Sequence, residues 1–208
     1  MEVKNNKEEV PFEHYLEEFK EIDPVQRAKE LEIPYEDNTF TVIMYGDTYR
    51  ISWPDGGLAC DNENAIAMVK KSGHILLLRF LITGKTLPTT GKYKTFRELP
   101  WGEVYLTPFN GRCIARLAYT YNFKREQFKK ACEELGGRPL SHSDAGYSFD
   151  FIGDYNLHIY LWGGDEEFPP NAQIEFSDNF VLGFSPEDNV VIPELLISAI
   201  SNQIKSYK

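Results

Sequence analysis

The sequence predicts an α+β fold in which a mainly antiparallel sheet packs with several helices, and two periodic patterns lead to this prediction. Apolar and polar residues alternate in short runs that form two separate groups, which is typical of strands. Apolar residues three and four positions apart recur before and between these groups, which is typical of helices. Strands that come in hairpin-like groups with helices between them favour an antiparallel sheet.

The N-terminal part begins with a polar tail, residues 1–9, and continues with two predicted helices. The apolar residues of the segment Val10–Glu21 are spaced by four and three, so they share one helical face. Asp23 is then suited to cap a helix, and the proline that follows it is suited to the first helical position. Together they predict a second helix over Pro24–Leu31. The tail is expected to precede a single domain over residues 10–208.

The next segment carries the pattern of a β-hairpin. The alternating runs Phe40–Met44 and Tyr49–Trp53 flank Gly46-Asp47, a pair typical of a two-residue turn. Alternate residues of the first run point to opposite faces of the strand, with Phe40, Val42 and Met44 on one face. The segment Pro54–Gly57 predicts a turn that closes the second strand.

The remaining elements follow from the same patterns and from the positions of glycine and proline. A helical stretch is expected from about Asp61 to Thr83, weakened at Ser72-Gly73, and Lys85–Thr107 is expected to be irregular or weakly stranded. Later helices are expected over Phe109–Tyr121, Lys124–Leu135 and Pro186–Lys205, with Pro193 as a candidate break, and strands over Tyr147–Phe151, Asn156–Trp162 and Ala172–Phe176.

Length and composition favour a soluble cytoplasmic protein. The 208 residues are 42% hydrophobic, which is enough to fill a core. The three cysteines are odd in number, form no CxxC motif and cannot hold an iron–sulfur cluster within this chain, which favours free thiols in a reducing compartment. The sequence begins without a signal peptide and contains no run long enough to span a membrane, so no membrane partner is expected.

Charge is distributed unevenly along the chain, whose net charge is −10. Residues 69–138 hold fourteen basic and five acidic residues, whereas the flanking segments are acidic. Either the basic middle packs beside the acidic flanks and the fields largely cancel, or it presents a basic face to an anionic ligand. Nucleic-acid-binding proteins are usually basic overall, so nucleic acid is not an expected partner.

The sequence contains no recognisable catalytic, metal or cofactor motif. Thr83–Thr86 resembles the end of a phosphate-binding P-loop, but Arg79 occupies a position that requires glycine, and a predicted helix precedes the segment where a strand is needed. The patterns GxGxxG, GxSxG and HExxH are missing, and the four histidines are too scattered to show metal-ligand spacing. Catalytic residues, metals and cofactors therefore stay unassigned.

The first candidate binding segment is the acidic loop, Trp162–Pro170, in which two glycines, three carboxylates and two prolines follow the end of a strand. Carboxylates on a stiff loop beside aromatic residues are suited to coordinating a hard cation or to accepting hydrogen bonds from a ligand. The alternative is a solvated turn in which one acid caps a backbone group. The residues assigned here are His158, Trp162, Asp165, Glu166 and Glu167, with Asp178, Glu187 and Asp188 as further acids of the same negative site.

The second candidate segment is Gly91–Phe109, where basic and aromatic residues alternate around Arg97 and Glu98. One interpretation is an anion-binding lip with stacking aromatic rings. The other is a long loop packed down by its own aromatic side chains. Long loops in compact domains are often functional, so Arg97 and Glu98 join the candidate ligand-binding residues.

Several short strings in these segments occur together: FRELP at Phe96–Pro100, GDEEFP at Gly164–Pro169, LGG at Leu135–Gly137 and WPDG at Trp53–Gly56. On these residues the chain, over about residues 25–195, resembles a prokaryotic domain family of unknown function. Members of that family are common in anaerobes, and some carry an iron–sulfur module like that of corrinoid iron–sulfur proteins. The resemblance implies a role near corrinoid or one-carbon metabolism and supplies no catalytic residues.

Three functional hypotheses follow, in order of preference. The first is a non-catalytic domain in which the Arg97 segment and the acidic loop line one cleft for a small polar or anionic ligand or a cofactor. The second is a protein-interaction module that docks an iron–sulfur or corrinoid partner through the basic middle of the chain. The third is a carboxylate- or metal-dependent enzyme with Glu166 or Glu167 as general base. It requires at least two of Asp165, Glu166, Glu167 and Asp178 to converge with His158 in a pocket.

Overall fold

The computed structural model describes residues 9–207, and the chain divides into two compact units at Thr86 and Leu87. Each unit contains an antiparallel sheet and several helices, so the predicted α+β class is confirmed. The predicted polar tail lies outside the described residues except for Glu9, which begins the first helix. The single domain expected over residues 10–208 stays a prediction.

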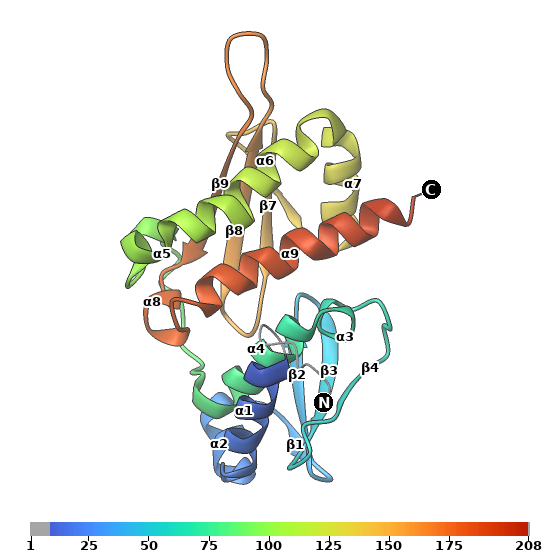
Figure 1. The fold of residues 1–208 in the computed structure, drawn as a ribbon, viewed down its shortest axis with the longest axis vertical. Helices are drawn as coiled ribbons and strands as arrows, with labels where there is room; N and C mark the ends of the chain where they lie inside the picture. The colour runs from blue at the N-terminus through green and yellow to red at the C-terminus, as the bar shows by residue number, and fades with distance from the viewer. Residues whose placement is uncertain (1–8, 208) are drawn as a thin grey trace, which may run out of the picture. The chain divides into compact units, whose positions relative to one another are not determined.

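Within residues 9–86, four strands form a sheet in the order β1-β2-β3-β4 (Figure 1). The helices are α1 (Glu9–Lys20), α2 (Pro24–Leu31), α3 (Ile66–Val69) and α4 (Lys71–Thr83), and the strands are β1 (Tyr35–Glu36), β2 (Thr39–Met44), β3 (Asp47–Ser52) and β4 (Leu58–Cys60). The N-cap predicted for α2 is confirmed, because Asp23 Oδ1 accepts hydrogen bonds from the N–H groups of Val25 and Gln26 at 3.1 and 3.0 Å.

The β2–β3 hairpin is confirmed, with a turn one residue earlier than predicted. Met44 pairs with Asp47, so the two-residue loop is Tyr45-Gly46 rather than Gly46-Asp47. Both loop residues have positive φ, 51° and 81°, as a type I′ turn requires. The apolar residues at alternate positions of β2 are buried, and Ile43 on the opposite face is exposed, as the alternation predicts.

The helical stretch predicted over Asp61–Thr83 is divided into α3 and α4 at Lys70 rather than at Ser72-Gly73. Lys70 adopts an extended conformation, with φ −128° and ψ 115°, which ends α3. Gly73 lies inside α4, where an added Cβ atom would approach the Cα atom of Ala67 to 2.8 Å. The glycine therefore allows the two helices to pack closely instead of breaking one of them.

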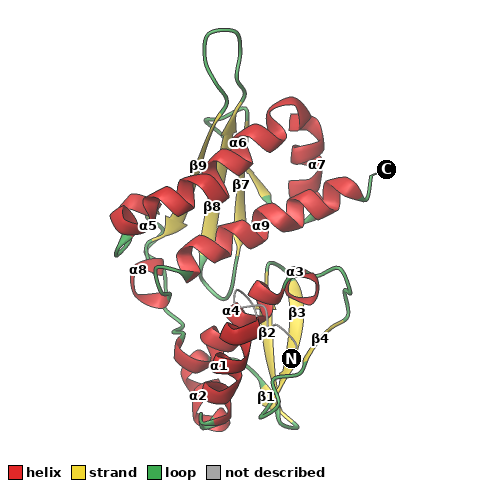
Figure 2. Cartoon of the chain, viewed as in Figure 1, coloured by secondary structure: helices red, strands yellow, loops and turns green. Residues whose placement is uncertain are grey.

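Within residues 87–207, five antiparallel strands form a sheet in the order β5-β9-β8-β7-β6 (Figure 2). The strands are β5 (Tyr93–Thr95), β6 (Arg138–Leu140), β7 (Ala145–Asp150), β8 (Asn156–Trp162) and β9 (Asn171–Ser177). The α-helices are α5 (Gly102–Phe109), α6 (Arg116–Tyr121), α7 (Arg125–Glu134), α8 (Phe180–Gly183) and α9 (Asp188–Lys205). Three other helical segments are η1 (Phe96–Glu98) and η3 (Asn122–Lys124), both 3₁₀, and η2 (Asn110–Ala115), which is π-helical.

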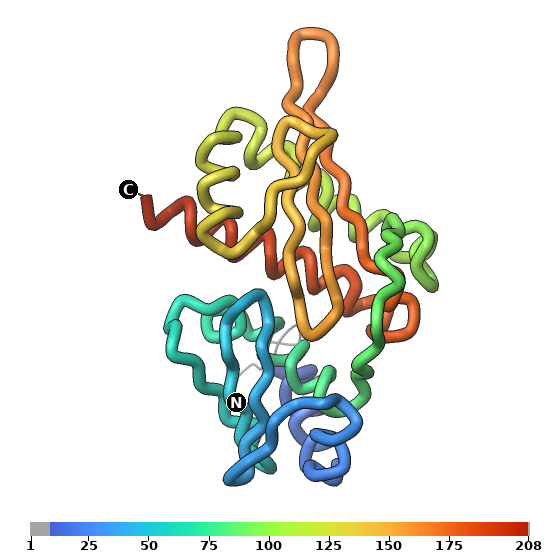
Figure 3. The backbone as a smooth tube through the Cα atoms, turned by 180° about the vertical axis from the view of Figure 1, so that it is seen from behind, coloured from blue at the N-terminus to red at the C-terminus, as the bar shows by residue number. Residues whose placement is uncertain are grey.

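Helices cover one face of this second sheet. α6 contacts β8 and β9, and α7 contacts β7. Figures 1 and 2 show α6 and α9 crossing in front of the strands, whereas Figure 3, seen from behind, shows the same strands in front. The alternation predicted for β8 is confirmed: Leu157, Ile159 and Leu161 are buried, and His158, Tyr160 and Trp162 are half-buried.

The segment Lys85–Thr107, predicted to be irregular or weakly stranded, contains β5, η1 and the start of α5. Helix continues from Gly102 through α5, η2 and α6, so it begins earlier than the predicted Phe109. A Cβ atom at Gly102 would overlap the carbonyl oxygen of Phe96, so glycine is needed where the helix begins against η1. Pro108 and the π-helical turn break the regular apolar spacing by which a helix is recognised in a sequence.

The C-terminal predictions agree with the structure apart from short elements. Helix α9 continues through Pro193 without a break. The predicted helix Lys124–Leu135 and the three predicted C-terminal strands correspond to α7, β7, β8 and β9. Strands β4 and β6 and helix α8 have three or four residues each, too few for a periodic pattern. None of the helices within residues 9–207 has the length and apolar content that a membrane crossing requires.

Candidate functional site

The acidic loop connects β8 and β9 and projects beyond the strands of its sheet (Figures 1 and 3). Asp165 Oδ1 accepts hydrogen bonds from the N–H groups of Glu167 and Phe168 at 2.9 and 2.8 Å, and these bonds lower the pKa of Asp165. The N–H group of Asp165 donates to the carbonyl oxygen of Phe168 at 2.9 Å. Asp165 therefore caps backbone groups and stiffens the loop, while Glu166 and Glu167 stay exposed.

The two glycines of the acidic loop provide space rather than unusual backbone angles, because neither Gly163 nor Gly164 has a positive φ. A Cβ atom at Gly163 would overlap Nη1 of Arg125. A Cβ atom at Gly164 would lie 2.6 Å from the backbone nitrogen of Pro170. After β8 the backbone therefore passes between the Arg125 side chain and the segment of the acidic loop that leads back to β9.

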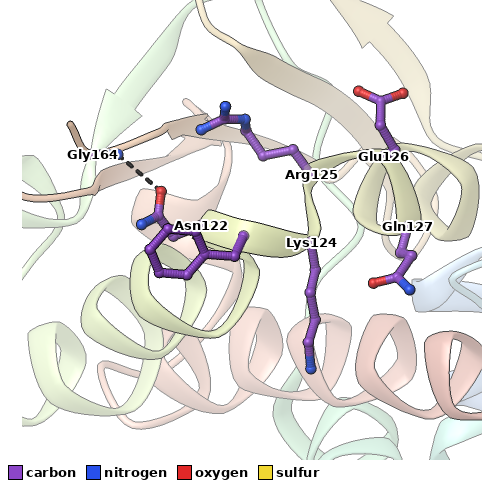
Figure 4. A pocket seen from close by; sticks show the side chains of 7 residues that line it. Asn122, Lys124, Arg125, Glu126, Gln127 and Gly164 are labelled. Atoms are coloured by element: carbon purple, nitrogen blue, oxygen red, sulfur yellow. Dashed lines mark hydrogen bonds between the residues drawn. The ribbon is translucent and has the colours of Figure 1, made fainter.

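Two side chains from other elements hold the base of the acidic loop. Asn122 Oδ1 accepts a hydrogen bond from the N–H group of Gly164 at 2.9 Å (Figure 4), and Asp144 Oδ2 accepts one from that of Gly163 at 2.8 Å. Asn122 is only 8% exposed and belongs to η3, the turn between α6 and α7. The base of the acidic loop is therefore fastened to η3 and to the residue that precedes β7.

Two surface hollows lie around this contact. The acidic hollow, of about 640 Å³, is lined by Tyr119 and the loop residues Asp165–Pro170. The basic hollow, of about 570 Å³, is lined by Lys124–Gln127 (Figure 4). Both hollows also share Asn122, Phe123 and Gly164 as lining residues. Their volumes lie in the range of ligand sites, about 300–1,000 Å³.

The aromatic side chains around the acidic hollow are unusually exposed. Phe123 is 95% exposed, and Phe168 and Tyr119 are each 66% exposed. Apolar side chains grouped in this way on a surface, with polar groups at the rim, mark interaction sites. Within residues 9–207, no basic group lies at ion-pair distance from the carboxylate of Glu166 or Glu167. The acidic hollow thus combines free negative charge with uncovered aromatic surface.

His158 and Trp162, also predicted as binding residues, line neither hollow. The Trp162 ring stacks on that of Tyr160, with centroids 6.0 Å apart. The His158 ring stacks on Tyr93 of β5 at 3.6 Å, and its Nδ1 atom lies 3.2 Å from the hydroxyl of Tyr160. These side chains form an aromatic cluster on the sheet face opposite the helices.

Arg97 and Glu98 each contact residues close to them in the chain. The Glu98 carboxylate accepts hydrogen bonds from the N–H group and the hydroxyl of Thr95, both at 2.8 Å, which completes a capping box and lowers the pKa of Glu98. Nε of Arg97 lies 3.3 Å from the carboxylate of Glu103. Neither residue lines a hollow beside the acidic loop, so the contact required by the shared-cleft hypothesis is not found in the described residues.

The further acids assigned to the negative site lie elsewhere. Asp178 follows the end of β9 that is distant from the acidic loop, and it accepts hydrogen bonds from both hydroxyls of Thr89-Thr90. These bonds lower the pKa of Asp178 to about 2. Glu187 and Asp188 lie at the start of α9, where Asp188 Oδ2 accepts a hydrogen bond from the hydroxyl of Ser185 at 2.7 Å. Asp178 and Asp188 thus hold turns together.

No catalytic arrangement emerges from the described residues. The enzyme hypothesis requires at least two of Asp165, Glu166, Glu167 and Asp178 to converge with His158, whereas the side chains that contact His158 are those of Tyr93, Tyr160 and Glu175. Within residues 9–207, no three His, Cys, Asp or Glu side chains are placed to hold a metal ion. Cys113 is fully buried, and burial raises the pKa of its thiol to about 12, so this cysteine stays protonated at neutral pH.

His158 is the most strongly perturbed histidine of the second unit. Its side chain is 14% exposed, and burial lowers its pKa to about 4, with a smaller contribution from the charge of Arg138. Glu175 Oε2 lies 3.9 Å from Nδ1, at the outer limit of an ion pair, and burial outweighs this attraction. The folded protein therefore holds His158 neutral at neutral pH.

We expect His158 to make stability fall in mildly acidic solution. Between the folded pKa of about 4 and the ordinary value of 6.5, the unfolded chain binds the proton and the folded chain does not. The free energy of unfolding should therefore decrease by at most about 3 kcal/mol as pH falls through this window. Urea unfolding of the native protein and of His158→Gln at several pH values measures the difference. Parallel pH profiles for the two proteins would contradict the expectation.

The sequence patterns did not single out Asn122, Phe123, Lys124 or Arg125 as site residues. Phe123 falls between two predicted helices and fits the apolar stripe of neither. Its place outside both apolar stripes is the one sequence signal of its exposure. The contact of Asn122 with Gly164 has no sequence signal, because it joins residues that are distant along the chain.

Comparison with known proteins gives one result. Searches among curated proteins and among solved structures return no match. Residues 23–199, most of the chain, match the family described as "Domain of unknown function (DUF3786)". This span includes η3, the acidic loop and both hollows. The chain belongs to this domain family of unknown function.

Proposed function

We propose that this protein is a non-catalytic binding domain whose acidic hollow docks a segment of a protein partner. The observation that carries the proposal is Phe123, which is 95% exposed where it lines the hollow. Phenylalanine is normally among the buried residue types, and aromatic residues are enriched in the cores of protein interfaces. A partner that covers this ring would gain the free energy of its burial, about 25 cal/mol per Å² of apolar surface.

The chemistry of the acidic hollow favours a segment with both apolar and basic side chains. Glu166 and Glu167 supply negative charge without a basic partner among the described residues. Phe168 and Tyr119 present aromatic surface to aliphatic groups or to a lysine or arginine cation. Because Asp165 already orders the loop, little conformational entropy is lost when a partner binds.

The exposure of these side chains favours a protein partner over a small ligand. Small-molecule sites typically bury about 70–90% of the ligand surface between concave walls. Here three lining rings are two-thirds exposed or more, which suits a surface contact between proteins. A protein that carries an iron–sulfur cluster or a corrinoid, the class implied by the family resemblance, is the first candidate partner that we propose to assay.

Selection of random peptides displayed on phage against the immobilised protein tests this function. We expect the enriched peptides to combine lysine or arginine with an aromatic or aliphatic residue. Fluorescence anisotropy then measures their affinity for the native protein and for variants. Phe123→Ala should weaken binding by about 30-fold, since truncating an interface hot spot costs about 2 kcal/mol. Glu166→Gln combined with Glu167→Gln should weaken binding mainly at low salt.

A matched control is available in Leu182→Ala. Leu182 is 69% exposed, in the same unit, and lines neither hollow. Its substitution should leave peptide affinity unchanged. Two results would argue against the acidic hollow as the docking site. One is that the selected peptides share no sequence pattern, and the other is that they bind Phe123→Ala as tightly as the native protein.

A further inference from the structure

The basic hollow contains an arginine without a partner. Arg125 is half-buried against Gly163, and within residues 9–207 its guanidinium has no carboxylate at ion-pair distance and no hydrogen-bond acceptor. Each of the other seven arginines contacts a carboxylate, another acceptor or an aromatic ring. A guanidinium presents its N–H groups in a planar fork that matches the oxygens of carboxylate and phosphate. Arg125 is therefore placed to bind an oxyanion.

Asn122 adds an independent donor to the same hollow. Its Oδ1 atom accepts from the N–H group of Gly164, which fixes the orientation of the amide (Figure 4). The amide nitrogen is therefore directed away from Gly164, and among the described residues it has no acceptor. The side chain is more than nine-tenths buried, and it lines the hollow. An amide that is held in place and only half satisfied is a donor available to a ligand.

The charges around the hollow also favour an anion. Lys124 is exposed and adds positive charge at the rim, although Figure 4 shows its side chain extending in a different direction from that of Arg125. The one acid that lines this hollow, Glu126, is paired with Lys129 at 3.0 Å. The Asp144 carboxylate accepts a hydrogen bond from Gly163 and lies beside the same glycine as the Arg125 guanidinium, so it offsets part of this positive charge without forming an ion pair. Helix α7 begins at this hollow, and the partial positive charge at its N-terminus also favours an anion.

We propose that the basic hollow binds an oxyanion through the Arg125 guanidinium and the Asn122 amide, with Lys124 adding positive charge. The inference rests on the proposed docking function for the origin of the anion, which is a carboxylate or phosphorylated side chain of the same partner segment. Because the two hollows share Phe123, such a segment carries an anionic group in one hollow and a basic group in the other.

Titration of the ¹⁵N-labelled protein with acetate or with inorganic phosphate, followed by NMR, tests the oxyanion site without any peptide. Sodium chloride at matched ionic strength is the reference for general salt effects. We expect saturable shifts of the Asn122 side-chain NH₂ signals and of the Arg125 Nε signal beyond those caused by chloride. Tighter binding of acetate indicates a carboxylate side chain as the natural ligand, and tighter binding of phosphate indicates a phosphorylated one.

Two variants locate the site. Asn122→Asp keeps an oxygen acceptor for Gly164 but replaces the NH₂ donor by a negative charge, so affinity should fall at least about tenfold while the Gly164 amide signal stays in place. Arg125→Gln removes the guanidinium and should reduce affinity to a similar degree. Lys129→Gln is the matched control, because Lys129 lies on α7 but does not line the hollow, and its affinity should be unchanged.

The oxyanion site would be overturned if acetate and phosphate shifted the NMR signals no more than chloride does. Equal anion affinity in Arg125→Gln and in the native protein would also overturn it. The result is separable from that of peptide selection. Anion binding without peptide binding would leave this inference in place and remove the docking function. Peptide binding could instead depend on Phe123 and be unchanged by substitution of Arg125 or Asn122. That result would support the docking function and remove the oxyanion site.

Discussion

Phe128→Ala is expected to lower the free energy of unfolding by about 3–5 kcal/mol, whereas Phe123→Ala should change it by less than about 0.5 kcal/mol. The two phenylalanines are five positions apart in the chain and lie at opposite extremes of solvent exposure. Phe128 is fully buried on α7, and Phe123 is 95% exposed. The Phe128 ring lies 4.9 Å from that of Tyr121 and 6.1 Å from that of Tyr147, so it joins α6, α7 and β7.

Urea unfolding followed by far-ultraviolet circular dichroism measures both variants under the same conditions. Because the substitution is chemically identical, the difference between them isolates the effect of burial. A loss of several kcal/mol in Phe123→Ala would mean that Phe123 supports the fold, and the case for a docking residue would fail. A small loss in Phe128→Ala would mean that α7, and with it the basic hollow, is not held by this core contact.

Asn156→Ala is expected to lower the free energy of unfolding by about 2–3 kcal/mol, because its buried side-chain amide joins strands β5, β7 and β8. Asn156 Oδ1 accepts hydrogen bonds from the hydroxyls of Tyr93 and Ser148 at 2.8 and 3.0 Å. Its Nδ2 donates to Asp150 at 2.9 Å, and its backbone N–H group donates to the Ser177 hydroxyl at 3.0 Å. Alanine would remove the hydrogen bond from each of the two hydroxyls and one donor from Asp150, which keeps Arg138, in a site where Asn156 is only 8% exposed.

Asn171→Ala is the matched control for this prediction. Asn171 begins β9 in the same sheet, is exposed, and accepts a hydrogen bond only from the N–H group of the next residue at 2.9 Å. Its substitution should cost less than about 1 kcal/mol. Thermal and urea unfolding of both variants give the comparison. Equal losses in Asn156→Ala and Asn171→Ala would show that the buried network contributes no more than an exposed turn.

The elements that could be predicted from the sequence are those formed by neighbouring residues. Asp23 and Pro24 define the start of α2, and the alternation in β8 predicts which of its side chains face the helices. The long helix from Gly102 was missed because Pro108 and a π-helical turn remove the regular spacing. Its start also depends on the close approach of Gly102 to Phe96, a contact that no periodicity records.

The candidate site was predicted only in part, for a related reason. The sequence marks the acidic loop through its glycines, acids and prolines, and these residues do stiffen it. It also marks Arg97 and Glu98, whose charges resemble those of a binding site, but Arg97 pairs with Glu103 of α5 and Glu98 completes the capping box of η1. A pattern reports which residue types are present, and it does not report whether a carboxylate or guanidinium already has a partner.

The α+β class, most of the secondary structure and the position of the acidic loop at the end of an aromatic strand can be read from the sequence alone. These properties depend on local backbone preferences and on which face of each element is apolar. By contrast, the contact of the acidic loop with η3, where Asn122 and Phe123 lie, is known only from the folded structure. An apolar pattern along the chain predicts that one face of an element will be buried. Which segment buries that face depends on packing between residues far apart in the chain.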